Sequence, residues 1–339
     1  MNLRRLGEFG LITKLQSRLQ YRSPQIVAGI GDDCAVYRGK PGKYQIISSD
    51  CLVEKVHFDL STTSPEQLGR KVLAVNLSDI AAMGGAPWLA LISTAIPKTF
   101  PVKFMERFYD GLNQISGQYQ IEIAGGDTVC SPKHFYINIT ILGEANKRRF
   151  FTRAGAREGD KIFVTGSLGD AALGLKLLQS RKTWAGPRAA QQLLIRKQLD
   201  PVPRICESRL LVKSKAEITA MIDVSDGLAQ DLSHICRASG TGAILWEESL
   251  PKSSAFEKIC FLNSIAPRKL VLTGGEDYEL LFTLKPESVK YLTGRFKKIG
   301  KDLTLIGEIT RNRGKTILVK KNGRREVLRK LMGFNHFAT

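Results

Sequence analysis

An apolar helix predicted between residues 64 and 85 carries a carboxylate close to its C-terminal end, and this pairing constrains the fold more than any other feature. Ser64 is a suitable N-cap, Pro65 suits the first helical position, and the glycine pair at 84–85 ends the helix. Asp79 stands among apolar neighbours and has no Lys or Arg within one turn. An ionised carboxylate buried without a partner is very costly, so a distant cation or a bound metal must compensate it. A tertiary salt bridge or a solvent-exposed helix face explains this residue equally well when it is taken alone.

Strand and helix patterns alternate along the rest of the chain and predict an α/β protein. Strands are expected at residues 44–48, 88–96, 134–143, 161–165, 221–224, 270–272 and 278–284, and further helices at 102–114, 170–178, 180–200 and 228–235. Asn322 and Gly323 predict a hairpin turn.

A charged, glycine-containing stretch at residues 145–160 separates two parts of this pattern, and a new strand begins directly after it. The 339 residues are enough for two domains with cores of their own. We therefore predict an N-terminal domain over residues 1–148 and a C-terminal α/β domain over residues 149–339.

Five short segments place aspartates next to glycine, serine or threonine, at residues 29–33, 48–50, 76–79, 125–128 and 223–227. Four of them follow a strand candidate or a glycine turn. Carboxylate and hydroxyl oxygens without His or Cys companions favour a hard cation, and Mg²⁺ combines such ligands with phosphate oxygens. Each aspartate alone could equally be a turn or N-cap residue.

Other phosphate-binding signals are weak or missing. The sequence contains no GxxxxGK[ST] loop and no HRD and DFG pair of the protein kinases. The Gly-Ser-Leu-Gly turn at residues 166–169 follows a strand and opens a helix, which could hold an anion, although a plain tight turn is the simpler interpretation. His57 lies seven residues after Asp50, but a lone histidine is more often structural than catalytic.

The net charge of +19 indicates anionic partners. Neither a helix-turn-helix nor an aromatic-interleaved RNA motif accompanies this charge, so we expect phosphorylated small molecules rather than nucleic acid. No run of about eighteen apolar residues or signal peptide is evident, so no membrane segment is expected. The six cysteines lack CxxC or zinc spacing, and we expect free thiols in a reducing cytoplasm.

Taken in order, eight segments resemble the thiamine-monophosphate kinase family: GEFGLI at 7–12, GIGDDCA at 29–35, SSDCLVEKVHF at 48–58, NLSDIAAMG at 76–84, GGDT at 125–128, TRAGAREGD at 152–160, DVSDGLAQDL at 223–232 and TGGEDYELLF at 273–282. The resemblance covers nearly the whole chain and ends at residues 333–338. It implies a two-domain α/β fold of the aminoimidazole-ribonucleotide-synthetase type, whose N-terminal sheets pair across a homodimer. It also implies conversion of thiamine monophosphate to thiamine diphosphate, the last step of thiamine diphosphate biosynthesis, with ATP as co-substrate and several Mg²⁺ ions.

The resemblance also implies roles for individual residues. The implied metal ligands are Asp33, Ser48, Ser49, Asp50, Asp79, Asp127, Asp223 and Asp226, and it leaves open whether Asp32 joins them. The implied ATP contacts are Tyr109, Gly126, Asp127, Arg153 and Ser225. The implied contacts to thiamine monophosphate are His57, Glu276 and Phe334.

The chemistry implied by this resemblance needs no general base and no covalent nucleophile. The acceptor is a phosphate monoester with a second pKa of about 6, so it is already an anion near neutral pH. The barrier lies in bringing two charged phosphates together, which metal ions lower by screening and alignment. Arg153 can add a planar fork of donors to the triphosphate.

Two kinds of alternative stay open. The first is another ATP-using enzyme of the same superfamily, such as aminoimidazole-ribonucleotide synthetase, selenophosphate synthetase or the hydrogenase-maturation dehydratase. The second and third of these use a reactive N-terminal cysteine or selenocysteine and a C-terminal cysteine, which this sequence lacks. The other alternative is a basic nucleic-acid-binding protein with degenerate metal sites, and the intact set of aspartates argues against it.

Overall fold

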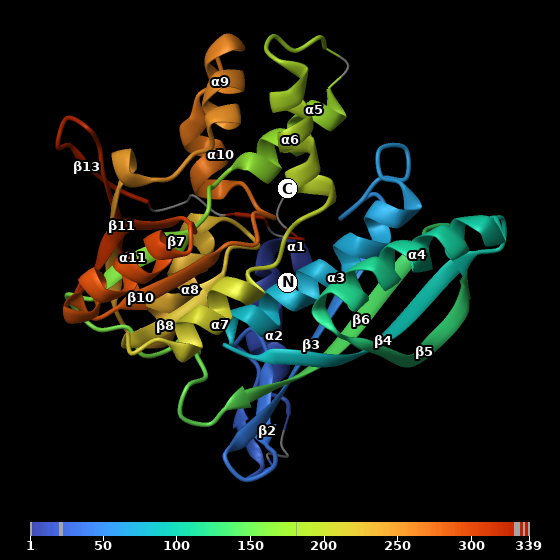
Figure 1. The fold of residues 1–339 in the computed structure, drawn as a ribbon, viewed down its shortest axis with the longest axis horizontal. Coiled ribbons are helices and arrows are strands. Elements are labelled where there is room, and N and C mark those ends of the chain that lie inside the picture. The colour runs from blue at the N-terminus through green and yellow to red at the C-terminus, as the bar shows by residue number, and fades with distance from the viewer. Residues whose placement is uncertain (1, 20–22, 181, 329–332, 335, 338–339) are drawn as a thin grey trace.

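The N-terminal half of the chain forms a mixed six-stranded sheet, coloured blue to green in Figure 1. Its strands are β1 (Ile26–Ala28), β2 (Ala35–Arg38), β3 (Lys43–Val53), β4 (Ala86–Pro97), β5 (Glu122–Ser131) and β6 (Tyr136–Asn146). They lie in the order β1-β2-β3-β6-β4-β5; β4 and β5 are parallel and the other neighbours antiparallel. The structure, a computed structural model, describes residues 2–19, 23–180, 182–328, 333–334 and 336–337.

Two long helices lie side by side on one face of this sheet (Figure 1), namely α3 (Pro65–Ala82) and α4 (Val102–Tyr119). The predicted cap of α3 is confirmed, because the Ser64 side chain accepts the Gln67 N–H and the Gln67 side chain accepts the Ser64 N–H. The two helices pack backbone to backbone, since a Cβ at Gly69 would lie only 2.1 Å from the Phe108 carbonyl oxygen. As a result α3 is buried over nearly its whole circumference.

The side chains of β3 alternate between the two faces of the sheet. Ser48 is buried and Asp50 half-buried on the face that carries α3, whereas Ser49 and Cys51 are exposed on the opposite face. Among the described residues, no helix covers that opposite face in Figure 1, which we call the outer face. The direction of each side chain along β3 therefore decides whether it can reach the helices.

The C-terminal half forms a seven-stranded sheet in the order β13-β12-β9-β11-β7-β10-β8. Its strands are β7 (Lys161–Thr165), β8 (Ile218–Asp223), β9 (Gly242–Trp246), β10 (Leu280–Leu284), β11 (Leu303–Thr310), β12 (Thr316–Val319) and β13 (Arg325–Val327). The helices of this half are α5 (Asp170–Gln179), α6 (Arg188–Leu199), α7 (Ile205–Lys213), α8 (Leu228–Ser239), α9 (Ser254–Leu262), α10 (Pro267–Thr273) and α11 (Val289–Lys298). Two N-terminal helices, α1 (Leu3–Leu6) and α2 (Glu8–Gln16), precede the first sheet.

Consecutive residues of the second sheet point into two different cores. Ile162 and Val164 of β7 pack with apolar side chains of α5, α8, α9 and α10. Phe163, between them, belongs to a core that also contains residues of α3, α7 and α11, and its ring stacks on Phe282 of β10. Both faces of this sheet are therefore covered, and one continuous core joins α3 to the C-terminal half.

Most predicted elements are confirmed, including the helices that begin near residues 65, 102, 170 and 228 and the hairpin at Asn322 and Gly323 that joins β12 to β13. Two aspartate segments were expected to follow strands or turns, and this is wrong. Residues 48–50 lie inside β3, and residues 125–128 lie inside β5. The ladders with β6 and β4 are made by the backbone, so polar side chains and glycines do not end these strands.

Two further expectations are wrong. Residues 270–272 form the end of helix α10 rather than a strand, because Pro267 opens a helix just before them. Helix α6 begins at Arg188 rather than at residue 180, directly after Pro187 as N-cap. In the part of the chain that the structure describes, no helix is long and apolar enough to span a bilayer.

Candidate active site

A cleft of about 1430 Å³ opens between the first sheet and the C-terminal half of the chain. Residues of α2, β3 and α3 line it from one half, and residues of α5, α8, α10 and the segment before β10 from the other. Most of the predicted site residues line this cleft: Asp33, Ser48, Ser49, Asp50, His57, Asp79, Arg153, Asp223, Ser225, Asp226, Glu276 and Phe334. Folding therefore brings to one cleft carboxylates as far apart in sequence as Asp33 and Glu276.

Three carboxylates from distant segments meet at one point of the cleft. Asp33 precedes β2, Asp79 lies in the last turn of α3, and Asp223 ends β8. One oxygen of each lies within 4.8 Å of the other two. Asp50 of β3 is close enough to add its negative charge to that of Asp79 and Asp223. We call these four residues the carboxylate cluster.

Serine hydroxyls donate to two members of the carboxylate cluster but do not offset the burial of its charges. Ser48 donates to Asp79, and Ser78 Oγ donates to Asp223 Oδ2 at 2.6 Å. Burial raises the pKa of Asp223 to about 7. Burial and the neighbouring charge of Asp50 raise the pKa of Asp79 well above its usual range. The fold therefore holds these carboxylates in an environment that penalises their ionised form.

Among the residues that the structure describes, Arg153 brings a guanidinium to the carboxylate cluster. Arg153 Nη2 lies 2.6 Å from Asp33 Oδ1, and the Arg153 backbone N–H donates to Asp32 Oδ1 at 3.1 Å. Burial, followed by repulsion from Asp33, raises the pKa of Asp32 to about 6. The second carboxylate oxygen of Asp33 is buried and has no hydrogen-bond partner among the described atoms. A single arginine thus leaves an excess of negative charge and an unused ligand atom.

This arrangement answers the question raised by Asp79 in the sequence. Its carboxylate faces the Ser48 hydroxyl and other carboxylates, so the tertiary salt bridge that the sequence left open as an alternative is not the explanation. Oxygen donors from aspartates and serines, an excess of negative charge and the orphaned oxygen of Asp33 suit a hard divalent cation. The residues present therefore fit the metal that the sequence leads us to expect.

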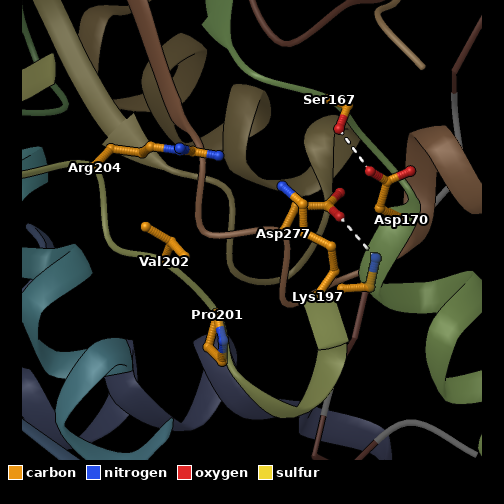
Figure 2. Close-up of a pocket in the computed structure, with 8 residues that line it drawn as sticks. Ser167, Asp170, Lys197, Pro201, Val202, Arg204 and Asp277 are labelled. Atoms are coloured by element: carbon orange, nitrogen blue, oxygen red, sulfur yellow. Dashed lines mark hydrogen bonds between the residues drawn. The ribbon is translucent and has the colours of Figure 1, made fainter. Parts of the chain in front are cut away.

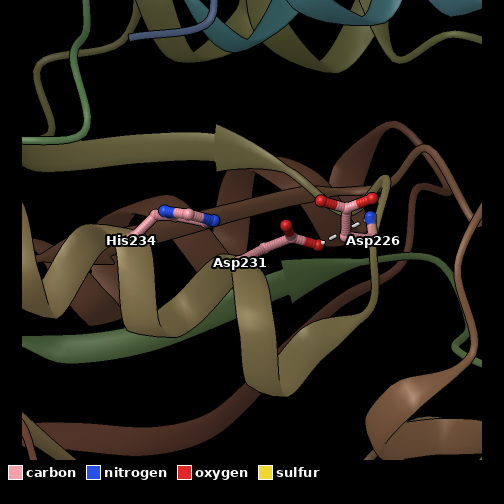
Figure 3. Close-up of side chains that lie close together, drawn as sticks. All are labelled: Asp226, Asp231 and His234. Carbon is pink, nitrogen blue, oxygen red and sulfur yellow. Dashed lines mark hydrogen bonds between the residues drawn. The ribbon is translucent and has the colours of Figure 1, made fainter. Parts of the chain in front are cut away.

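A second group lies at the start of α8, where Figure 3 shows Asp231 and His234 on one helix and Asp226 on the loop before it. One donor atom of each lies within 4.8 Å of the others. Asp231 accepts the backbone N–H groups of Asp226 at 3.2 Å and Gly227 at 2.9 Å, so its carboxylate fixes the loop. Burial lowers the pKa of His234 to about 4, and its ring packs on Phe9 of α2 with centroids 4.6 Å apart.

A buried ion pair lines another part of the cleft. Lys71 of α3 is 1% exposed, and its Nζ lies 2.8 Å from Glu276 Oε1. The other Glu276 oxygen accepts a hydrogen bond from Gln198 of α6. Glu276 has a φ of +66°, so its backbone is held in the left-handed region. Lys71 and Asp79 are eight residues apart on α3, which separates them by about 12 Å along the helix axis.

Three rings gather beside this ion pair. His57 lies with its ring centroid 5.0 Å from His336 and 6.5 Å from Phe334, and the last two rings are 4.9 Å apart. The His57 Nδ1 atom accepts the Val53 N–H at 3.0 Å. Burial, followed by the charge of His336, lowers the pKa of His57, so the neutral form is favoured. Of the predicted C-terminal segment, Asn335 and Ala338 lie outside the described residues.

The predicted turn at residues 166–169 binds a carboxylate of the chain itself (Figure 2). Asp277 accepts the N–H groups of Gly169 at 2.7 Å and Ala171 at 3.3 Å, at the start of α5. Ser167 donates to Asp170 at 2.7 Å. The adjoining cavity measures only about 10 Å³, which is enough for about one water molecule. These amides therefore serve the fold, as the simpler interpretation of the sequence suggested.

Tyr109, Gly126 and Asp127 do not line the cleft. In the strand ladder, Asp127 of β5 lies beside Ser93 of β4. Ser93 lies beside Asn138 of β6, which in turn lies beside Cys51 of β3. Paired residues on neighbouring strands share a face, so Asp127 lies on the outer face, three strands away from Cys51. Tyr109 is exposed on α4. The chain by itself does not place these three residues beside the carboxylate cluster.

Sequence reasoning missed several residues that line the cleft, namely Lys71, Gln198, His234 and His336. It also missed Gln230 and Asp231, which hydrogen-bond to the Asp226 residue of the cleft. Lys71 could have been found from the sequence, because it interrupts the apolar face of α3. It stands four residues before Val75 and eight before Asp79, a spacing that places the three on one side of the helix. The others gave no such signal, because a Gln or His in an amphipathic pattern is ordinary at a solvated surface. Their roles depend on contacts between distant segments.

Comparison with known proteins gives matches over nearly the whole chain. Residues 31–145 match the family model described as AIR synthase related protein, N-terminal domain, and residues 157–320 match the corresponding C-terminal domain. The thiamine-monophosphate kinase of Bacillus subtilis strain 168 is 35% identical over 98% of this chain and 100% of its own length. That of Escherichia coli strain K12 is 36% identical over 98% of this chain and 99% of its own.

Solved structures give the same result. A structure described as AaThiL complexed with AMPPCP and TMP is 36% identical and covers 99% of both chains, with a TM-score of 0.85. Thiamine monophosphate kinase from Aquifex aeolicus is 33% identical, with a TM-score of 0.79 over 96% of this chain and 99% of the other. These likenesses confirm the predicted two-domain architecture of the aminoimidazole-ribonucleotide-synthetase type.

Proposed function

This chain belongs to the thiamine-monophosphate kinase family, and we propose that it transfers the γ-phosphoryl group of ATP to thiamine monophosphate, forming thiamine diphosphate. One observation carries the proposal: a single cleft joins a carboxylate cluster with an excess of negative charge to a pocket with an oriented carboxylate and three aromatic rings. The first part suits metal-bound phosphates, and the second suits an aromatic cation. A relative of 36% identity is described in complex with an ATP analogue and TMP.

Mg²⁺ ions are held, in this proposal, by Asp33, Ser48, Ser49, Asp50, Asp79, Asp127, Asp223 and Asp226. When bound, Mg²⁺ would screen the repulsion between donor and acceptor phosphates and stabilise charge on the transferred group. Asp32 lies beside Asp33 but already accepts the N–H groups of Asp33 and Arg153, so we assign it to loop positioning. Ser49 points to the outer face, so we assign its contribution on this chain to the backbone carbonyl.

The residues of the chain contribute binding and orientation rather than proton transfer. The acceptor phosphate is anionic near neutral pH and attacks without a base. Arg153 is held by Asp33 with two guanidinium nitrogens, which fixes the remaining donors for the triphosphate. Ser225, in the turn before α8, adds an ATP contact. Direct transfer predicts inversion at an isotopically chiral γ-phosphorus, and retention would contradict a single in-line step.

The thiamine moiety is bound, in this proposal, by Glu276, His57 and Phe334. Lys71 and Gln198 hold the Glu276 carboxylate in a fixed plane, so it presents oriented negative charge to the thiazolium cation. The ring of Phe334, which is 45% exposed, can stack on the same cation. Because His57 is neutral and its Nδ1 accepts the Val53 N–H, its Nε2–H is free to donate to the substrate.

A homodimer would explain why three predicted residues lie away from the cleft. Gly126 and Asp127 lie on the edge strand β5, and Tyr109 is exposed on α4. A second subunit can bring these residues to the cleft of its partner if the outer faces of the two sheets pack together. The exposed apolar side chains Trp88, Leu91 and Val129 on β4 and β5 suit such a contact. In this arrangement each site combines Asp50 of one subunit with Asp127 of the other.

Mixing two inactive variants tests this arrangement. Asp50→Asn and Asp127→Asn chains, each inactive alone, are refolded together. If the site is shared, half of the sites in a mixed dimer are intact, and the random mixture recovers about a quarter of wild-type activity. If both residues serve the same chain, every site carries a defect, and the mixture stays inactive.

The activity itself is tested by incubating the protein with ATP, Mg²⁺ and thiamine monophosphate and separating the products by chromatography. We expect thiamine diphosphate and ADP in equal amounts. Phosphorylation of free thiamine or of an aminoimidazole precursor in its place would contradict the proposal and favour a superfamily alternative. We also propose that the two domains meet between residues 148 and 149 and that the protein acts in the cytoplasm.

A further inference from the structure

The side-chain amide of Gln230 connects two parts of the cleft. Its Nε2 atom donates to Asp226 Oδ2 at 2.8 Å and to the Phe334 carbonyl oxygen at 3.0 Å. Gln230 is 8% exposed and lies in the first turn of α8, so its amide has a defined position. One group with two N–H donors thus serves a predicted metal ligand and the C-terminal segment together.

The C-terminal segment is attached at the same place through its backbone. The Phe334 N–H donates to the Asp226 carbonyl oxygen at 3.0 Å. A Cβ at Gly333 would lie 2.0 Å from that oxygen, so only glycine allows this close approach. The segment therefore rests directly on the loop that carries Asp226, and Gln230 adds the second attachment.

This attachment places a wall of the thiamine pocket. The Phe334 ring lies 4.9 Å from His336, which lies 5.0 Å from His57. A displacement of the segment would move Phe334 and His336 together and open the pocket beside His57. The position of these two rings therefore depends on the same amide that binds the Asp226 carboxylate.

We propose that Gln230 is a positioning residue that couples binding of the thiamine acceptor to the cation and nucleotide end of the cleft. A cation on Asp226 fixes the plane of that carboxylate, which keeps the Gln230 amide aligned on the Phe334 carbonyl. The ordered segment in turn favours the acceptor. By linkage, bound acceptor must then favour the cation by the same factor. This inference rests on the proposed function, because it takes Phe334 and His336 as part of the acceptor pocket.

Gln230→Met removes both hydrogen bonds while keeping the length of the side chain. Calorimetric titration with thiamine monophosphate is compared with and without Mg²⁺ and a non-hydrolysable ATP analogue. In the wild type we expect tighter acceptor binding when both are present. In the variant we expect about tenfold weaker acceptor binding in their presence and the loss of most of that difference, since two hydrogen bonds are removed.

Gln191→Met is the matched control. Gln191 Nε2 also donates two hydrogen bonds to backbone oxygens, those of Trp184 and Gly186, but it lies at the start of α6 outside the cleft. We expect its titrations to match the wild type. In steady-state kinetics, Gln230→Met should raise KM for thiamine monophosphate, and by the same linkage it should raise KM for ATP at saturating acceptor. The Kd of the ATP analogue measured without acceptor should stay within about twofold of the wild type, which a general loss of structure would not produce.

Gly333→Ala provides a second route to the same displacement, because it keeps the Gln230 side chain while the added Cβ would lie 2.0 Å from the Asp226 carbonyl oxygen and 3.1 Å from the Gln230 Cβ, which lifts the segment. We expect it to reproduce the weaker acceptor binding. The inference is overturned if the wild type binds the acceptor and Gln230→Met binds it equally well with unchanged coupling. If the wild type itself binds no thiamine monophosphate, the proposed function has failed instead.

Discussion

Helix α3 carries two charged side chains, Asp79 and Lys71, whose surroundings are opposite in kind. At its C-terminal end, Asp79 lies with three other carboxylates, and the Arg153 guanidinium forms an ion pair with one of them, Asp33. About 12 Å towards its N-terminus, Lys71 is 1% exposed and is paired with Glu276, which Gln198 also contacts. The first end is electrostatically incomplete without a ligand, whereas the second is complete as folded.

The difference shows what each end contributes to the reaction. Carboxylates that repel one another are useful only if cations arrive with the substrate, so their energetic cost is met on binding. A carboxylate already oriented by a lysine and an amide is preorganised and binds without rearrangement. One end of the cleft therefore supplies charge for catalysis, and the other supplies shape and orientation for the acceptor.

Asp50→Asn should produce the largest effect, because it removes a ligand from the incomplete end. We expect turnover to fall by about a thousandfold, as expected for several kcal/mol of lost charge stabilisation. The metal-free variant should be no less stable than the wild type, since a repulsive charge is removed. Coupled assays of ADP release and thermal unfolding measure both effects.

Asp110→Asn is the matched control for this change. Asp110 is exposed on α4, away from the cleft, and the substitution should alter turnover by less than about twofold. Near-normal turnover of Asp50→Asn would show that the carboxylate cluster is not the metal site.

Lys71→Met should break the complete end instead. Removing Lys71 leaves the charge of Glu276, whose side chain is 24% exposed, without its cation, which destabilises the fold by about 1–3 kcal/mol. Chemical unfolding measures the loss. KM for thiamine monophosphate should rise more than KM for ATP, because Glu276 loses its orientation.

The double variant Lys71→Met with Glu276→Gln distinguishes pairing from simple packing. Because no buried charge is left, we expect it to recover most of the stability but not the affinity for thiamine monophosphate. Additive stability losses in the double variant would refute the role of the ion pair.

The pH dependence of stability tests the aspartates at the Asp79 end of the cleft. The pKa is about 7 for Asp223 and about 6 for Asp226, above the value of about 3.9 in an unfolded chain. Their stabilising contribution is therefore present below about pH 4 and is lost as pH rises through 6 and 7. The metal-free protein should melt at a lower temperature at pH 8 than at pH 5.

Mg²⁺ should reverse this loss at pH 8 and have little effect at pH 5, where protonated carboxyls bind it poorly. At a hundred times its Kd, a single Mg²⁺ ion adds about 2.7 kcal/mol. Asp223→Asn should flatten the pH dependence. Equal stabilisation by Mg²⁺ at both pH values would contradict the assignment of raised pKa values to this cluster.

Arg107→Ala should have the smallest effect. Arg107 of α4 pairs with Glu66 of α3, and both side chains are in contact with solvent. Such a solvated pair contributes little to stability, because water screens the attraction between its charges. Chemical unfolding should show this small change, with unchanged kinetics. A loss as large as that of Lys71→Met would show that burial does not distinguish the two pairs.

The sequence predicted much of the fold because helix caps and hydrophobic periodicity are local properties. Ser64 and Gln67 form the predicted cap, and the alternating strands lie where their patterns place them. The prediction failed where backbone pairing overrode side-chain polarity, as at residues 48–50 and 125–128. Those errors mattered for the site, because being inside a strand decides which face a side chain occupies.

The sequence by itself determined the chemistry of the donors: aspartate and serine oxygens, one buried acid in an apolar helix, and an ordered set of motifs shared with one family. Only the tertiary structure decided which of these donors meet. It placed Asp79 beside Asp223, Lys71 against Glu276, and Asp127 on the outer face, three strands from Cys51. The reason is physical: side-chain chemistry is a property of each residue, whereas charge interactions and burial depend on distances that only long-range packing sets.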